Sequence, residues 1–341
     1  MAKPLSIERP LVALVGADTL LAKEIRDVLE ERKPAPRVQL IAASADDSTV
    51  LAAVDDEAVV MAPLSAVSLE GSRVAFLAGS AASSRRTLKV NPEGGPTLID
   101  LAGALEEQPT ARLRAPSAET SAVKSSGVSS AVSSGVQVIA HPAAIALAMF
   151  LARTADVAAI RRSIMHVFEP ASELGKRGLE ELQQQTVAVL AFQKLKTEVF
   201  DTQLAFSMLA RFGEEAIESL EGIEQRLERH LASLLAASPG IPMPSVRLIQ
   251  APVFHGHSIS AWVEFEENPG EDTLAARLAD SGIDVRPDDP PSNAGIAGQS
   301  GLSVGAISVD RNNPRACWFW LVTDNLRLAA ENAVAVAREL L

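Results

Sequence analysis

Short, nearly continuous apolar runs recur through the first third of the chain, with polar or helical stretches between them. The first run, LVALVG at residues 11–16, precedes TLLAKEIRDVLEERK, whose apolar positions repeat at helical spacing. Similar runs lie at residues 38–44, 57–62, 74–80 and 97–103. Such runs are typical of strands in a parallel sheet covered on both faces and joined by right-handed βαβ crossovers. We predict an α/β domain with a doubly wound parallel sheet.

The pattern changes at residues 115–135, a stretch rich in Ser, Ala and Gly without apolar periodicity. This composition predicts a loop or domain crossover with mobile parts. A strand (VQVIAHP), a mostly buried helix (AAIALAMFLART) and a second strand (IRRSIMHVFEPA) follow. We therefore place a domain boundary at residue 142.

The second predicted domain, residues 143–324, combines helices with long, largely antiparallel strands. Helical spacing predicts helices at 172–190 and 214–235, and alternation predicts one or two strands over 245–266. LSVGAISVD and ACWFWLV, separated by RNNP, predict an antiparallel hairpin. We therefore predict an α+β domain. The apolar faces of its strands are wider than the nearby helices can cover, so we also predict that this domain forms a homodimer.

The last helix, residues 325–341, carries an apolar stripe that predicts packing on the first domain, residues 1–142. A chain of 341 residues with 47% hydrophobic and 22% charged positions is long enough for two such folded domains.

The net charge and the distribution of apolar residues argue against two classes of partner, nucleic acids and membranes. A net charge of −12 argues against nucleic acid, whose affinity for proteins comes mostly from Lys and Arg. No apolar run reaches the roughly 18 residues that cross a bilayer, and MAKPLSIERP lacks the apolar core of a signal peptide. We expect a cytoplasmic protein with no membrane partner. The single cysteine, Cys317, excludes intramolecular disulfides and cysteine metal clusters, and ACWFWLV predicts that it is buried.

The order of these segments resembles the aspartate-semialdehyde dehydrogenase family, an amino-acid biosynthesis family, and most closely its Usg-like branch. The resemblance rests on VALVGADTLLAKEIRDVLEER, TLIDLAG, FDTQLAFSML, QAPVFHGHS, LSVG and DNLR, and it covers nearly the whole length. It implies a Rossmann-like NAD(P)-binding domain followed by an α+β dimerisation domain. The implied activity is oxidation of a semialdehyde through a cysteine thioester, with a glutamine, a histidine acid/base and an arginine for the substrate carboxylate.

The implied NADP site lies at the first turn, Gly16, Ala17, Asp18 and Thr19, with Asn325 from DNLR near it. The family pattern has glycines at the positions of Thr19 and Ala22, where they allow a tight turn and close approach to the pyrophosphate. Both are replaced, and Asp18 adds a carboxylate near the expected phosphates. The resemblance thus implies NADP binding that is weak or lost, and we name no cofactor.

The implied catalytic positions have also changed. The cysteine falls at Ala144, the glutamine at Glu169 and the arginine at Gln250, while His257 is retained. His141 stands in place of an asparagine. Alanine forms no thioester, and a neutral amide offers no charged fork to a carboxylate. We expect a pseudoenzyme that keeps a binding or assembly role, with room for a small-molecule ligand.

Two other functions stay open at this stage. One is an active NAD(P)-dependent semialdehyde dehydrogenase. The other is a changed chemistry in which Glu169 orients His257 as a base, with Ser258 or Ser172 nearby. His255 and His257 would share a face if they lay on one strand, and with His141 and Glu169 they could bind a metal. A His-x-His pair alone is weak support, so we predict no metal site.

Overall fold

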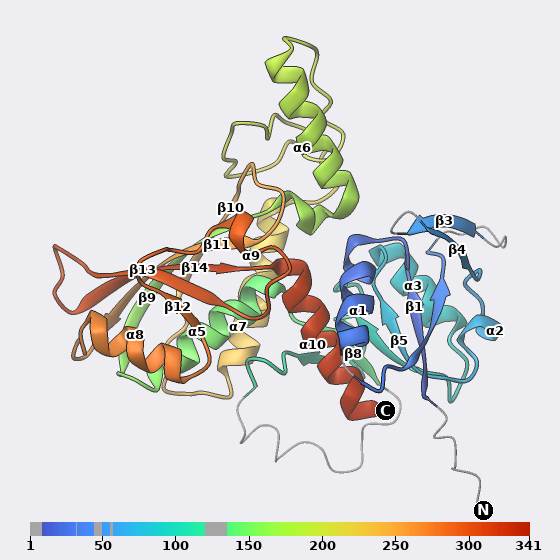
Figure 1. The fold of residues 1–341 in the computed structure, drawn as a ribbon, viewed down its shortest axis with the longest axis horizontal. Coiled ribbons are helices and arrows are strands. Elements are labelled where there is room, and N and C mark those ends of the chain that lie inside the picture. The colour runs from blue at the N-terminus through green and yellow to red at the C-terminus, as the bar shows by residue number, and fades with distance from the viewer. Residues whose placement is uncertain (1–8, 32, 44–49, 55–56, 120–134) are drawn as a thin grey trace, which may run out of the picture. The chain divides into compact units, whose positions relative to one another are not determined.

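The computed structural model describes residues 9–31, 33–43, 50–54, 57–119 and 135–341 (Figure 1). Its chain divides into two compact units. The first comprises Met1–Pro116, Lys124–Ile139 and Ala329–Leu341, and the second comprises Ser117–Val123 and Ala140–Leu328. The predicted loop at 115–135 falls largely on residues 120–134, which lie outside the described residues.

The first unit is built on a parallel six-stranded sheet with the order β2-β1-β5-β6-β8-β7. Its strands are β1 (Leu11–Val15), β2 (Arg37–Ile41), β5 (Ser72–Leu77), β6 (Thr97–Asp100), β7 (Arg112–Arg114) and β8 (Val136–Ile139). Helices α1 (Leu20–Glu31), α2 (Ala66–Leu69) and α3 (Ala81–Val90) connect them. The core contains strand residues such as Val15, Ala75 and Val138, as expected for a sheet covered on both faces.

Residues 57–62 do not join this parallel sheet as we expected. Strand β4 (Glu57–Met61) pairs antiparallel with β3 (Val50–Val54) in a separate two-stranded sheet. A single parallel bridge, Ile41 to Ala62, links its end to β2. A short apolar run does not specify its partner, and here the neighbouring segment in sequence pairs with it.

The second unit is built on a mixed six-stranded sheet with the order β10-β9-β11-β14-β13-β12. Its strands are β9 (Ile160–Glu169), β10 (Ser245–Gln250), β11 (His257–Phe265), β12 (Asp284–Arg286), β13 (Ser303–Val309) and β14 (Ala316–Thr323). Neighbouring strands pair antiparallel along the series β9, β11, β14 and β13. At the two edges of the sheet, β10 pairs parallel with β9 and β12 pairs parallel with β13. The hairpin predicted around RNNP is therefore present.

Helices line this sheet along one side in Figure 1. They are α5 (Pro142–Ala155), α7 (Leu220–Leu235) and α8 (Glu271–Asp280). Helix α6 (Gly175–Leu190) instead extends away from the sheet (Figure 1). Helix α9 (Asn293–Ile296) is short, and α10 (Asn325–Leu340) ends the chain. The predicted fold class, a doubly wound parallel sheet followed by an α+β domain with long antiparallel strands, is confirmed.

Two predicted helices begin later than their sequence patterns suggested. Residues 171–174 form a 3-10 turn before α6, and α7 begins only after Ser219. The Ser219 hydroxyl accepts a hydrogen bond from the Gly222 amide, which is the usual way for serine to start a helix. Among the described residues, no helix is long and apolar enough to cross a membrane.

Gly16 provides a test of the first turn. It has a positive φ of 80°, and a Cβ atom there would lie 2.6 Å from the backbone of Gly79. We expect Gly16→Ala to lower the free energy of unfolding by about 2–4 kcal/mol, because left-handed strain and a backbone clash add together. Urea unfolding measures this value.

Gly94→Ala is the matched control, since Gly94 has a φ of 74° but no atom within 4 Å of its added Cβ. It should cost only the left-handed strain, about 1–2 kcal/mol. Equal losses in the two variants would contradict a close approach of Gly16 to Gly79.

Candidate functional site

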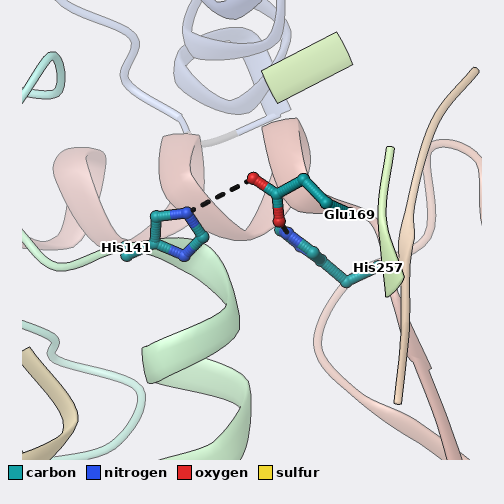
Figure 2. Close-up of side chains that lie close together, drawn as sticks. All are labelled: His141, Glu169 and His257. Atoms are coloured by element: carbon teal, nitrogen blue, oxygen red, sulfur yellow. Dashed lines mark hydrogen bonds and ion pairs between the residues drawn. The ribbon is translucent and has the colours of Figure 1, made fainter. Parts of the chain in front are cut away.

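Three buried titratable side chains meet within the second unit (Figure 2). His141 precedes α5, Glu169 ends β9 and His257 begins β11. The register of β9 and β11 pairs Phe168 with Ser258, so Glu169 and His257 are the next residues along these strands at one end of the sheet. Their side chains and that of His141 are no more than 1% exposed.

Glu169 and His257 form a direct ion pair, with 2.8 Å between Glu169 Oε2 and His257 Nε2. Burial is the largest single effect and by itself raises the pKa of Glu169, but the combined interactions with His257 and His141 outweigh it and the pKa falls to about 2. Burial likewise lowers the pKa of His257, and the Glu169 charge and hydrogen bond reverse this, so the pKa is raised overall. Each group holds the other in its charged form.

His141 faces the other carboxylate oxygen at a longer distance. Its Nε2 lies 3.7 Å from Glu169 Oε1, too far for a hydrogen bond (Figure 2). Its Nδ1 accepts a hydrogen bond from the Ala143 amide at 3.2 Å, so a neutral ring carries its proton on Nε2. The backbone N–H of His141 donates to Nδ1 of His230 on α7. The ring is thereby fixed at the start of α5.

Glu173 is a fourth titratable group, and it was not predicted from the sequence. Its carboxylate oxygens lie 3.9 Å from Nε2 of both His141 and His257. The only signal in the sequence was its position four residues after Glu169, across Pro170 and the 3-10 turn. Because that turn brings the chain back toward the end of β9, the two carboxylates share one site.

Asn325 holds Glu173 in place from the first residue of α10. Its side-chain amide donates to Glu173 Oε1 at 2.8 Å, and its Oδ1 accepts from the Gly256 amide at 3.0 Å and the Ser172 hydroxyl at 3.2 Å. The sequence had placed Asn325 near the cofactor. In the structure its amide is engaged with the buried carboxylate site.

Ala144 and Gln250, the positions that the resemblance gives to the cysteine and arginine, are both fully buried. Ala144 lies in the first turn of α5 and offers no polar side-chain atom. Gln250 Nε2 donates to the backbone oxygens of Glu169 at 2.9 Å and Ala251 at 3.2 Å. Its amide therefore fastens the end of β10 to the end of β9.

The remaining sequence candidates do not join the cluster. Strand β11 begins at His257, so His255 lies outside the strand and the shared face expected for this pair does not form. Ser258 Oγ donates to Asn293, and Ser172 Oγ donates to Asn325. Neither serine makes a hydrogen bond with His257, so a serine–histidine–glutamate arrangement is not assembled.

The first turn of the first unit fits a pyrophosphate poorly. The Thr19 hydroxyl accepts a hydrogen bond from the Ala22 amide at 3.1 Å and also contacts the backbone oxygen of Gly16 at 2.9 Å. It thus occupies an amide at the start of α1 that could otherwise bind an anion. Asp18 is exposed in the same turn, whereas Gly16 and Ala17 are buried. By the resemblance, this carboxylate lies near the expected phosphates, where like charge opposes binding.

Known proteins show clear similarity to this chain. The family profile described as semialdehyde dehydrogenase, dimerisation domain, matches residues 151–328. A USG-1 protein homolog of Pseudomonas aeruginosa is 30% identical, covering 100% of this chain and 99% of the relative. An aspartate-semialdehyde dehydrogenase of Rickettsia bellii is 24% identical, covering 97% of each. A solved structure described as a probable aspartate-semialdehyde dehydrogenase from Pseudomonas aeruginosa has a TM-score of 0.83 and 28% identity, covering 97% of this chain and 98% of its own.

The fold and these matches define a protein of the semialdehyde dehydrogenase class, with a dimerisation domain in its second half. The chain belongs to the semialdehyde dehydrogenase family, in its Usg-like branch.

The ion pair predicts a defined pH window for stability. Glu169 has a lowered pKa, so its contribution to the free energy of unfolding is complete above pH 4.5. This contribution is lost as the pH falls toward about 2. His257 has a raised pKa, so its contribution to the free energy of unfolding is complete below pH 6.5. This contribution is lost as the pH rises through the raised pKa. We expect Glu169→Gln to cost about 3 kcal/mol inside this window and less on both sides of it. Urea unfolding across pH measures the difference.

Glu267→Gln, at an exposed position, is the control for removing one negative charge. It should change stability by less than about 0.5 kcal/mol throughout. A cost of Glu169→Gln that keeps rising above the window would contradict the assigned charge states.

Proposed function

We propose that this chain does not run the cysteine-dependent oxidation of its family and that it works as a binding or assembly protein. The observation that carries the proposal is the position of its only thiol. Strands β11 and β14 pair His257 with Thr323 but Val263 with Cys317. Six residues of antiparallel strand separate these positions by about 20 Å. Cys317 is also fully buried, so it cannot serve the cluster from either its own chain or a partner.

Two further positions support the same conclusion. The Gln250 amide bonds to backbone oxygens, so it supplies no charge for a substrate carboxylate. Glu169 is a buried acceptor with a lowered pKa, whereas the family glutamine offers a neutral amide. An anionic substrate would therefore meet fixed negative charge where its family's chemistry takes place.

The proposed assembly is a homodimer through the domain that contains residues 151–328, because the matching family profile describes a dimerisation domain. The proposed binding role is for a small-molecule ligand in the second unit, which contains the buried polar cluster. The altered first turn favours weak or absent NADP binding. Light scattering at micromolar concentration would test the dimer, and a monomer would contradict it.

A second candidate function follows from the 2.8 Å pair of Glu169 and His257. A carboxylate that orients and charges an imidazole is also an arrangement used for acid/base chemistry. This candidate requires a substrate whose reacting atom reaches His257. If any turnover is found, an unchanged rate in His257→Gln would exclude it.

The position of Cys317 predicts the outcome of a direct assay. Aspartate semialdehyde, NADP and phosphate should give no NADPH above the rate without protein, because no nucleophilic sulfur lies near His257. The absorbance of NADPH follows the reaction. Ala144→Cys should also stay inactive, since Glu169 and Gln250 are unchanged. Turnover by the wild-type chain that Cys317→Ala abolishes would overturn the proposal.

The first turn predicts no stabilisation by nucleotide. A ligand that binds only the folded state raises the unfolding midpoint, and millimolar NADP or NAD should leave it within about 1 °C. Differential scanning fluorimetry measures the shift. Asp18→Asn is the informative comparison, because removing the carboxylate should make any residual binding stronger. A clear rise with the wild-type chain would show that the altered turn still binds phosphates.

A further inference from the structure

The cluster of His141, Glu169 and His257 has the composition and spacing of a metal site. Each residue offers a ligand atom, these atoms all lie within 4.8 Å of one another, and all three residues are buried. Two imidazoles and one carboxylate form the protein ligand set of many catalytic zinc sites, and the same set binds non-haem iron. We infer that this cluster binds one divalent transition-metal ion of the zinc class.

Two buried polar atoms without hydrogen-bond partners support an ion in this cluster. His141 Nε2 and Glu169 Oε1 face each other at 3.7 Å, and neither makes a hydrogen bond with any described residue (Figure 2). Both side chains are 1% exposed, so bulk water does not satisfy them. Buried polar atoms almost always have a partner, and the exceptions often mark the position of an ion or a water molecule. An ion between these two atoms would satisfy both.

The distances between the histidines and the carboxylates suit ligands around one metal. His141 Nε2 lies 3.7 Å from Glu169 Oε1 and 3.9 Å from Glu173 Oε2, and His257 Nε2 lies 3.9 Å from Glu173 Oε1. Bonds of about 2.0–2.2 Å at tetrahedral or wider angles separate two ligand atoms by roughly 3.3–3.9 Å. Only the 2.8 Å ion pair of Glu169 and His257 is shorter, and it would have to open by less than about 1 Å.

Glu173 completes the site on its more open side. Its side chain is 14% exposed, against 1% for Glu169, and the Asn325 amide fixes one of its oxygens. It can bind the ion directly or leave that position to water, as catalytic zinc sites do. The positive charge also fits, because one divalent cation balances both carboxylates while both imidazoles stay neutral.

Binding has two identifiable costs within the cluster. His257, which the Glu169 charge holds protonated, must lose the proton on Nε2, and its 2.8 Å ion pair with Glu169 must open. An ion on His141 Nε2 displaces the proton there and moves the ring to its Nδ1–H form, so the 3.2 Å hydrogen bond from the Ala143 amide is lost. Metal–ligand bonds to His141, His257 and Glu169 replace both the long hydrogen bond and the ion pair, so the exchange favours the ion. From the sequence, His141, Glu169 and His257 were grouped with His255 as ligands that could bind a metal. A metal was not favoured there, because a His-x-His pair alone is weak support.

This inference does not depend on the loss of thiol chemistry. A negative dehydrogenase assay says nothing about metal, and a failure to bind metal would leave the position of Cys317 unchanged. The two proposals are therefore tested separately, one by turnover of aspartate semialdehyde and the other by the metal content of the folded chain.

The experiment is equilibrium dialysis of the chelator-treated full chain against zinc chloride, with metal measured by mass spectrometry. We expect one zinc ion per chain. Glu169→Gln and His141→Asn should each weaken the affinity more than about 100-fold, since each removes a direct ligand. Asparagine also keeps a good capping residue before α5. His166→Gln, on the same β9 strand and half-buried, is the matched control and should bind as the wild type does.

Cobalt(II) gives a second measurement that needs no variant. The wild-type chain should show the strong visible bands of four- or five-coordinate cobalt without a thiolate charge-transfer band, because Cys317 lies far from the cluster. A folded wild-type chain that takes up no zinc would overturn the inference. So would unchanged affinity in both Glu169→Gln and His141→Asn, an equal loss in His166→Gln, or cobalt bands of a purely octahedral surface ion.

Discussion

The ion pair of Glu169 and His257 is the interaction on which the second unit's site depends. A carboxylate that is 1% exposed would be strongly unfavourable alone, and it is held in its charged form by the imidazole 2.8 Å away. The pair also occupies the adjoining ends of β9 and β11, so the register of the central sheet fixes its geometry. His141, Glu173 and Asn325 are then arranged around a charge pair whose backbone positions are fixed by the sheet.

Periodicity predicted most of the fold because the strands of the parallel sheet are buried on both faces and are therefore apolar throughout. It failed for β4, which pairs with the preceding strand β3 and not with the larger sheet. The apolar run of β4 cannot be distinguished in sequence from a strand of that sheet. Helix starts were placed too early at 172 and 214, because polar residues with helical spacing do not show where the first hydrogen-bonded turn forms.

The candidate site was only partly predictable for a different reason. His257, Glu169 and His141 were named from sequence, and the fold brings these three together although they are far apart in the chain. Glu173 and the role of Asn325 were not foreseen, because they depend on how the 3-10 turn and the start of α10 meet. His255 was wrongly grouped, since the exact residue at which β11 begins decides which histidine faces the core.

The replacements that the resemblance implies change the charged groups of the site as a set. By resemblance the family binds an anionic substrate with an arginine, beside a neutral glutamine and a cysteine. Here the arginine position holds Gln250, the glutamine position holds Glu169, and Glu173 adds a second carboxylate close to both histidines. The described cluster thus brings two carboxyl groups and two imidazoles together in a poorly solvated place. These groups are ligands for a cation, whereas Gln250 offers no charged fork to an anionic substrate.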